Sequence, residues 1–160
     1  MRVWILRHGQ AEPTAASDAE RSLTETGRAE AIRMAEQLAG HALEVILVSP
    51  YQRAQQTAEL VGQQLNFRRG ITTVDWLTPE DDPMAALDQL ADRAESELLL
   101  VSHQPLVGQL ISLLVDGHRQ GHYYMPTAGL ACLDMPLPAA GAADLISLTN
   151  PAQAARNSEE

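Results

Sequence analysis

The stretch "LLLVSHQPLVGQLISLLV", residues 98–115, combines a fully apolar strand with the helix that follows it. Residues 98–102 are too uniformly apolar for a strand with one solvated face, and they predict a strand that is covered on both faces. After Pro105, apolar residues recur at helical spacing, at Leu106, Leu110, Ile111 and Leu114. A buried strand leading into an amphipathic helix predicts an α/β layered domain.

The same alternation of strand and helix repeats along the chain. Further strands are predicted at 2–6, 45–49 and 70–75, and a C-terminal hairpin at 129–135 and 143–149. Because crossover helices separate the first four strands, those strands are expected to run parallel, and the hairpin adds antiparallel members. We therefore predict a three-layer α/β/α fold around a mixed, largely parallel sheet.

Capping residues mark where the helices should begin. Thr24 is predicted to cap a helix over 25–39, which Gly40 ends. Ser49 followed by Pro50 predicts a helix over 50–65, and Asp82 followed by Pro83 predicts another that carries Leu87, Leu90 and Ala94. The helix after the fourth strand is expected over 105–115.

The composition fits one domain over 1–150, with a polar tail at 151–160 that we expect to fray. The chain has 21 acidic and 11 basic residues, so its net charge is −10. This balance argues against nucleic acid or an anionic membrane as partner. Cys132 is alone and the five histidines form no HExxH pair, so we expect no disulfide framework and no metal site. A monomeric cytoplasmic protein without a cofactor is the expectation.

Basic side chains follow three of the predicted strands. Arg7 and His8 end the first strand, Arg53 lies in "SPYQR" after the second, and His103 follows the fourth. Because parallel strands end at one edge of a sheet, these side chains should converge there. Arginine matches phosphate oxygens with its planar fork, and histidine supplies a nucleophile near neutral pH. The set therefore predicts a phosphoryl-transfer site.

Each of these residues also has a structural interpretation. Arg7 and His8 are compatible with a surface ion pair at a strand end, Arg53 with an exposed first helical turn, and His103 with a satisfied core-edge histidine. Arg21 fits the rim of the pocket or an ion pair with Asp18 equally well. The coincidence of four such residues at one edge favours function.

Four motifs in this order resemble the histidine phosphatase superfamily, which is also called phosphoglycerate mutase-like. They are "RHG" (7–9), "SDAERSLTETG" (17–27), "SPYQRAQQT" (49–57) and "SH" (102–103). The resemblance implies a phosphoglycerate mutase-like fold and a phosphorylated His8. It also implies that Arg7, Arg53 and His103 bind the phosphate, with Gly9 allowing close backbone approach and Arg21 at the rim.

Within the superfamily, the small size and "SHQPLVG" (102–108) resemble the phosphohistidine phosphatases, which implies phosphohistidine in phosphotransfer domains or phosphocarriers as substrate. About twenty residues separate Asp75 from Glu97, so we expect no lid and a broad, open site. Members that cleave esters supply a general acid after the third strand, where this chain has Glu80, Asp81 and Asp82. Asp82 fits a helix cap better, and imidazole, with a pKa of about 6.5, leaves without much assistance.

Two other functions fit the same residues. One is a phosphatase or mutase of small phosphate esters on the same fold, and the other is a phosphoprotein-binding module without turnover. The segment 117–127, "GHRQGHYYMPT", lies near the predicted edge and is either an ordinary loop or a contact for a partner protein.

Overall fold

The computed structural model describes residues 1–159, and its centre is one six-stranded sheet with the order β3-β2-β4-β1-β5-β6. The first four strands in this order run parallel, and β5 and β6 are antiparallel to their neighbours. The strands are β1 (Arg2–Arg7), β2 (Val45–Val48), β3 (Ile71–Thr73), β4 (Glu97–Ser102), β5 (Leu130–Asp134) and β6 (Asp144–Thr149). The predicted mixed, largely parallel sheet is confirmed.

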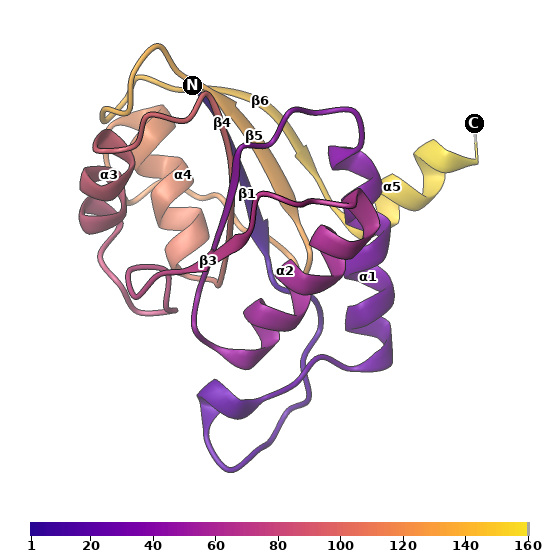
Figure 1. Cartoon of the computed structure of the whole chain (residues 1–160). Coiled ribbons are helices and arrows are strands. Elements are labelled where there is room, and N and C mark those ends of the chain that lie inside the picture. The colour runs from indigo at the N-terminus through magenta and orange to yellow at the C-terminus, as the bar shows by residue number, and fades with distance from the viewer. Residues whose placement is uncertain (160) are drawn as a thin grey trace.

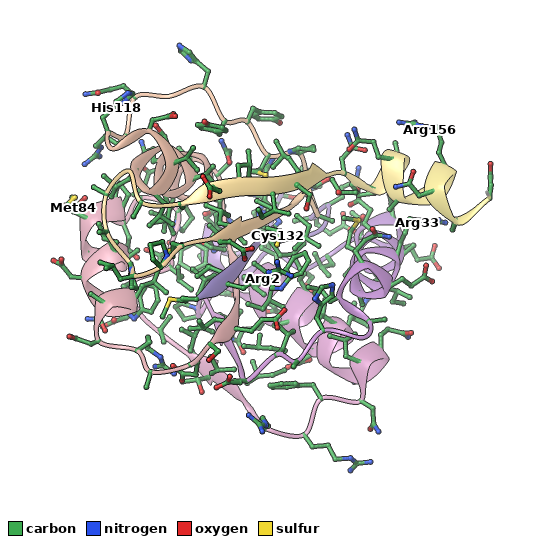
Figure 2. All side chains as sticks on the ribbon, turned by 90° about the horizontal axis from the view of Figure 1, so that it is seen from above. Arg2, Arg33, Met84, His118, Cys132 and Arg156 are labelled. Atoms are coloured by element: carbon green, nitrogen blue, oxygen red, sulfur yellow. The ribbon has the colours of Figure 1, made fainter. Side chains whose placement is uncertain are left out.

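Helices cover both faces of the sheet (Figure 1). One face carries α1 (Glu25–Ala35), α2 (Gln52–Leu65) and α5 (Pro151–Ser158), and the other carries α3 (Pro83–Ala91) and α4 (Leu106–Asp116). Short 3₁₀ turns occupy Asp18–Glu20 and Glu36–Leu38. Figure 2 shows Arg33 of α1 and Arg156 of α5 on the same side of the sheet, opposite Met84 of α3. The predicted three-layer α/β/α architecture is therefore confirmed.

Two hydrophobic cores, one on each face, explain the uniformly apolar strands. Along β1, Val3 and Ile5 pack into the core under α3 and α4, whereas Trp4 and Leu6 pack into the core under α1 and α2. The residues of β2 and residues 98–102 of β4 are buried throughout. Since successive side chains of a strand point to opposite faces, a strand with apolar cover on both sides must be apolar at every position.

Two of the predicted helix caps are confirmed. The Thr24 side chain accepts a hydrogen bond from the backbone N–H of Gly27 at the start of α1, and the Asp82 carboxylate accepts one from Met84 at the start of α3. Such caps satisfy N–H groups that have no partner within the helix. The helix predicted to end at Ala39 is α-helical only to Ala35.

Three boundaries differ from the sequence prediction. Ser49 does not cap α2, because the chain bends at Pro50 and Tyr51 and the helix begins only at Gln52. The third strand is limited to Ile71–Thr73 at the sheet edge, where its side chains are exposed. Ala94 lies beyond the end of α3 at Ala91, so it does not belong to that helix.

The expectation that residues 151–160 fray is wrong for Pro151–Ser158, which form α5. Asn150 and Gln153 form a capping box at its start, and Ala154 is buried in the core that α1 and α2 share. A capping box satisfies two N–H groups at once, so it stabilises even a short helix with one buried contact. None of the helices that residues 1–159 form has the length and apolar composition of a membrane span.

Candidate active site

Three neighbouring parallel strands end side by side and place the chemistry of the site. In the register of the sheet, Val48 of β2 pairs with Val101 of β4, and Arg7 of β1 pairs with Ser102 of β4. Ser49, His103 and His8 are the next residues after these three strands. The central strand β4 therefore places His103 between the other two. In Figure 1, the segment that joins β1 to α1 projects from this edge.

The contacts of its two ring nitrogens hold His8 in one tautomer. Its Nδ1 lies 2.7 Å from the backbone oxygen of Gly9, which can only accept a hydrogen bond, so Nδ1 carries the proton. The Nε2 atom lies 3.3 Å from Nε of Arg53, which can only donate. The free lone pair of the imidazole is therefore on Nε2, and it lies against a guanidinium group.

Arg53 is almost completely buried, with 4% of its surface exposed, although it is charged. All three of its nitrogens donate hydrogen bonds: Nε to His8, Nη1 to the backbone oxygen of Asp18 (2.7 Å) and Nη2 to the Asp18 carboxylate (3.2 Å). The guanidinium carbon also lies 5.1 Å from the ring centre of Tyr51. These contacts fix the fork beside His8.

One turn further along α2, Thr57 connects the helix to the first strand. Its hydroxyl donates to the backbone oxygen of Arg53 (2.8 Å) and accepts from the N–H of Gly9 (3.1 Å). Residues four apart lie on one face of a helix, so Arg53 and Thr57 both face the end of β1.

Gly9 is required for a backbone contact inside the protein. A Cβ atom at Gly9 would lie 2.4 Å from the backbone oxygen of Gly27, and one at Gly27 would lie 2.0 Å from the backbone oxygen of Gln10. We expected Gly9 to let the backbone approach a phosphate. The contact seen in the structure is with the first turn of α1, which the two glycines bring against the end of β1, and the approach to a phosphate stays a prediction.

Arg7 ends β1, and its side chain contacts the segment that precedes β5. Its Nη1 donates to the backbone oxygen of Met125 (2.9 Å) and lies 3.5 Å from the hydroxyl of Tyr124. Its Nε is buried and has no hydrogen-bond partner within residues 1–159. Arg7 therefore retains donor capacity that the protein itself does not use.

His103 is more deeply buried than His8, with 1% of its surface exposed. Its ring centre lies 5.1 Å from that of His8 and 5.0 Å from that of Tyr51. Its Nε2 forms a 2.7 Å hydrogen bond with the hydroxyl of Ser49. Its Nδ1 is buried and meets no partner in the described part of the chain.

Both histidines are neutral near pH 7. Burial, together with the nearby Arg53 and Arg7, lowers the pKa of His8 to about 4 against the opposing hydrogen bond to Gly9. Burial also lowers the pKa of His103 to about 2, with contributions from His8 and Arg53. A neutral imidazole keeps a lone pair, which is what a nucleophile requires.

These low pKa values predict that the fold loses stability in mild acid. An unfolded histidine takes up a proton below pH 6.5, whereas His8 and His103 in the folded protein stay neutral, so protons favour unfolding. We expect the free energy of unfolding to fall by about 1.6 kcal/mol for each histidine between pH 6.5 and pH 5. Urea unfolding across this range measures it, and His8→Gln should about halve the slope. A free energy that is constant from pH 6.5 to pH 5 would contradict the burial of neutral histidines.

Arg21 contacts Asp18, which in turn accepts hydrogen bonds from Arg53. Its Nη1 donates to the Asp18 carboxylate (2.9 Å), and its Nε donates to the backbone oxygen of Glu12 (2.7 Å). The hydrogen bond from Arg21 and the nearby Arg53 together hold the pKa of Asp18 below its usual range. The ion pair with Asp18 that the sequence left open is therefore present, and it links Arg21 to Arg53.

The three acidic candidates after β3 are engaged elsewhere or exposed. The Asp81 carboxylate accepts hydrogen bonds from the N–H and hydroxyl of Thr78, and Asp82 caps α3 and pairs with Arg119 at 3.3 Å. Glu80 is exposed. Among residues 1–159, no group of three or more His, Cys, Asp or Glu side chains is arranged to hold a metal ion.

The expectation of a broad, open site does not hold for the floor of the pocket. His8, Arg53 and His103 are each at most 6% exposed, because the segment around Asp18 and the ring of Tyr51 lie against them. Two cavities are lined by residues that adjoin these three in the chain or contact them, Gln104 next to His103 and Asp18 against Arg53. One of about 280 Å³ is bounded by residues 13–21, and one of about 350 Å³ is bounded by Gln104 and the 119–124 segment.

Three polar or small residues of the site were not identified as such from the sequence. The sequence predicts Ser49 as a helix cap, and it places Thr57 and Gly27 only as the last residues of two motifs, 49–57 and 17–27. A pattern was available for Thr57, because it lies four residues after Arg53 on the same helix. No pattern in a single sequence indicates that Gly9 and Gly27 touch.

Comparison with known proteins identifies relatives over most of the chain. The model of the histidine phosphatase superfamily (branch 1) matches residues 3–77. The phosphohistidine phosphatase SixA of Escherichia coli (strain K12) is 42% identical over 122 residues, which are 73% of this chain and 76% of the relative. A SixA homolog of Haemophilus influenzae is 34% identical over 139 residues, 79% of this chain and 85% of the relative.

The fold also matches a solved structure closely. The structure of the protein histidine phosphatase SixA complexed with tungstate superposes with a TM-score of 0.83 and 35% identity, covering 95% of this chain and 98% of that one. Because the match covers 95% of this chain, the similarity is not confined to the N-terminal motifs.

Proposed function

The chain belongs to the histidine phosphatase superfamily, and from this membership we propose that it hydrolyses phosphohistidine in proteins through a phospho-His8 intermediate. The observation that carries the proposal is the lone pair of His8 Nε2, which is neutral, buried and adjacent to Arg53. No other imidazole in the described chain combines a fixed tautomer with a guanidinium group against its free nitrogen.

In the proposed reaction, His8 Nε2 attacks phosphorus in line with the leaving imidazole. The bond between phosphorus and the substrate nitrogen breaks, a new bond to His8 forms, and the leaving imidazole takes a proton from solvent. Water then attacks phospho-His8, which releases inorganic phosphate and restores the free imidazole. The net reaction consumes one water molecule.

Arg7, Arg53 and His103 are proposed to hold the phosphoryl oxygens throughout. Phosphoryl transfer depends on positioning and charge stabilisation, and buried donors supply both without reorganising. Nε of Arg7 and Nδ1 of His103 are unpaired buried nitrogens at the edge where the strands end. The related SixA binds tungstate, a tetrahedral oxyanion similar in shape to phosphate.

The engaged carboxylates favour phosphohistidine over phosphate esters. Expulsion of an alkoxide needs a free general acid. Of the three candidate carboxylates, Asp81 and Asp82 already hold Thr78 and the start of α3, which leaves only the exposed Glu80. Imidazole has a pKa of about 6.5 and leaves readily once it is protonated in water. The 42% identity to SixA, a phosphohistidine phosphatase, supports the same substrate class.

We propose phosphotransfer domains or phosphocarrier proteins as the partners, served by a monomeric enzyme in the cytoplasm. Cys132 is free and buried, which suits a reducing compartment.

A substrate panel tests this function. Inorganic phosphate release is measured with phosphorylated phosphotransfer domains, phosphocarriers, p-nitrophenyl phosphate and small sugar phosphates at equal pH. At least one phosphohistidine protein should give a kcat/KM about 10²-fold or more above every ester. A preference for a small ester would favour the general phosphatase, and binding without turnover of any substrate would favour the binding module.

A further inference from the structure

Ser49 is completely buried next to His103, at a position where a helix cap was expected. It follows β2, and His103 follows the neighbouring strand β4, so the sheet register brings the two side chains together. The hydroxyl of Ser49 lies 2.7 Å from Nε2 of His103. It also accepts a hydrogen bond from the backbone N–H of Tyr51 at 3.2 Å.

The protons of these groups allow only one arrangement that leaves no buried hydroxyl unpaired. A serine hydroxyl has one proton and two lone pairs, and the Tyr51 N–H occupies one of the lone pairs. Within residues 1–159, His103 Nε2 is the one acceptor in contact with the Ser49 hydroxyl. If Nε2 carried the proton of His103, the hydroxyl would accept two hydrogen bonds, and its own proton would be buried without a partner.

We propose that Ser49 is a positioning residue whose hydroxyl donates to Nε2 of His103 and thereby keeps the ring proton on Nδ1. His103 then donates a hydrogen bond from Nδ1 to the phosphoryl group, an inference that rests on the proposed function of the site. Nδ1 is buried and unpaired in the described chain, so a phosphoryl oxygen supplies the partner that it lacks.

This contact makes the two neighbouring histidines chemically different. Both rings carry their proton on Nδ1. In His8 the acceptor is the carbonyl of Gly9, which leaves the lone pair of Nε2 for the reaction. In His103 the partner of Nε2 is a donor, which leaves an N–H group for the reaction. A carbonyl beside one ring and a hydroxyl beside the other thus define a nucleophile and an oxyanion donor on two rings whose centres lie 5.1 Å apart.

Without the hydroxyl, His103 can place its proton on Nε2 and turn a lone pair toward the negatively charged oxygens. Ser49→Ala is therefore expected to shift the tautomer of His103 toward Nε2–H and to lower kcat/KM by about 10- to 100-fold. Affinity for tungstate should fall in the same variant. Ser49→Cys keeps a weaker donor and should recover part of both losses.

Ser102→Ala is the matched control. Ser102 is also buried at the end of β4, but its hydroxyl donates to the backbone oxygen of Leu77 at 2.7 Å. Losing this hydroxyl should destabilise the fold without changing the tautomer of His103. If Ser49 served only in packing, Ser49→Ala and Ser102→Ala would both leave the tautomer of His103 unchanged.

The decisive test is a long-range ¹H–¹⁵N correlation spectrum of the wild-type protein at pH 7, with His103 assigned from the His103→Gln spectrum. The inference predicts a protonated Nδ1 and an unprotonated Nε2 for His103, and a shift of this pattern in Ser49→Ala but not in Ser102→Ala. A protonated Nε2 in the wild-type protein overturns the inference, even when phosphate release is intact. Because the spectrum needs no substrate, absent phosphate release with the predicted tautomer would count against the proposed function instead.

Discussion

Phosphate release from a phosphohistidine protein should fall by at least about 10⁴-fold in the His8→Ala variant. Nε2 of His8 is the one nitrogen at this edge that combines a free lone pair with a contact to Arg53. Without it, water would have to attack the substrate phosphorus directly. The remaining donors of Arg7, Arg53 and His103 can still bind the phosphoryl group, so binding of tungstate should persist.

His41→Ala is the control for this variant. His41 is exposed and pairs with Glu97, 3.3 Å from its carboxylate. Glu97 is the first residue of β4, so this pair lies at the end of the strand that is remote from His103. The assay follows inorganic phosphate in single-turnover mode, which separates the chemical step from product release. Turnover by His8→Ala within tenfold of the wild-type rate would remove His8 as the nucleophile.

Arg53→Ala should lower kcat/KM by about 10³-fold, and Arg53→Lys should recover only a small part of this loss. The guanidinium group holds His8 through Nε and Asp18 through both Nη atoms. A lysine restores the charge but cannot reach three acceptors in one plane. Removal of the fork should therefore lower kcat, because His8 loses its orientation, and raise KM, because the phosphoryl group loses a ligand.

The matched control is Arg69→Lys, the same exchange at an exposed position between α2 and β3. Steady-state kinetics on the same phosphohistidine substrate give kcat and KM separately. Wild-type kinetics in Arg53→Lys would show that charge alone suffices and that the geometry of the fork is not used.

The sequence predicts the sheet well because burial on both faces leaves a strong signal. Residues 98–101 have to be apolar at each position to fill two cores, and this pattern is visible without a structure. The strand ends then locate Arg7, His8 and His103 at one edge, since parallel strands in one sheet share their direction. The pattern of strands in the sequence is therefore enough to predict where the site lies.

Contacts between distant segments were not predictable in the same way. Ser49 before a proline fits the statistics of helix caps, but its hydroxyl is engaged by His103, 54 residues further along the chain. The covered floor depends on Arg53 reaching Asp18, and the close approach of Gly9 to Gly27 depends on how α1 sits on the sheet. Each of these results from tertiary packing, for which a single sequence carries no periodic signal.

The few positive charges of this acidic chain are concentrated at the site. The chain carries a net charge of −10, yet it places Arg7 and Arg53 beside two neutral histidines at one edge of the sheet. Keeping those histidines unprotonated lowers stability in acid, and it supplies a lone pair and an N–H group where the phosphoryl group is proposed to bind. The same burial therefore produces the pH sensitivity of the fold and the proposed reactivity of His8.

The most direct test of the central claim is to trap the phosphorylated enzyme. The wild-type protein is mixed with a phosphohistidine protein, quenched in alkali within milliseconds and digested for mass spectrometry under conditions that preserve phosphohistidine. We predict phosphate on His8 and on no other residue, formed faster than inorganic phosphate appears. Release of inorganic phosphate with no phosphorylated His8 at any time, or a phosphoryl group on a different residue, would contradict the mechanism.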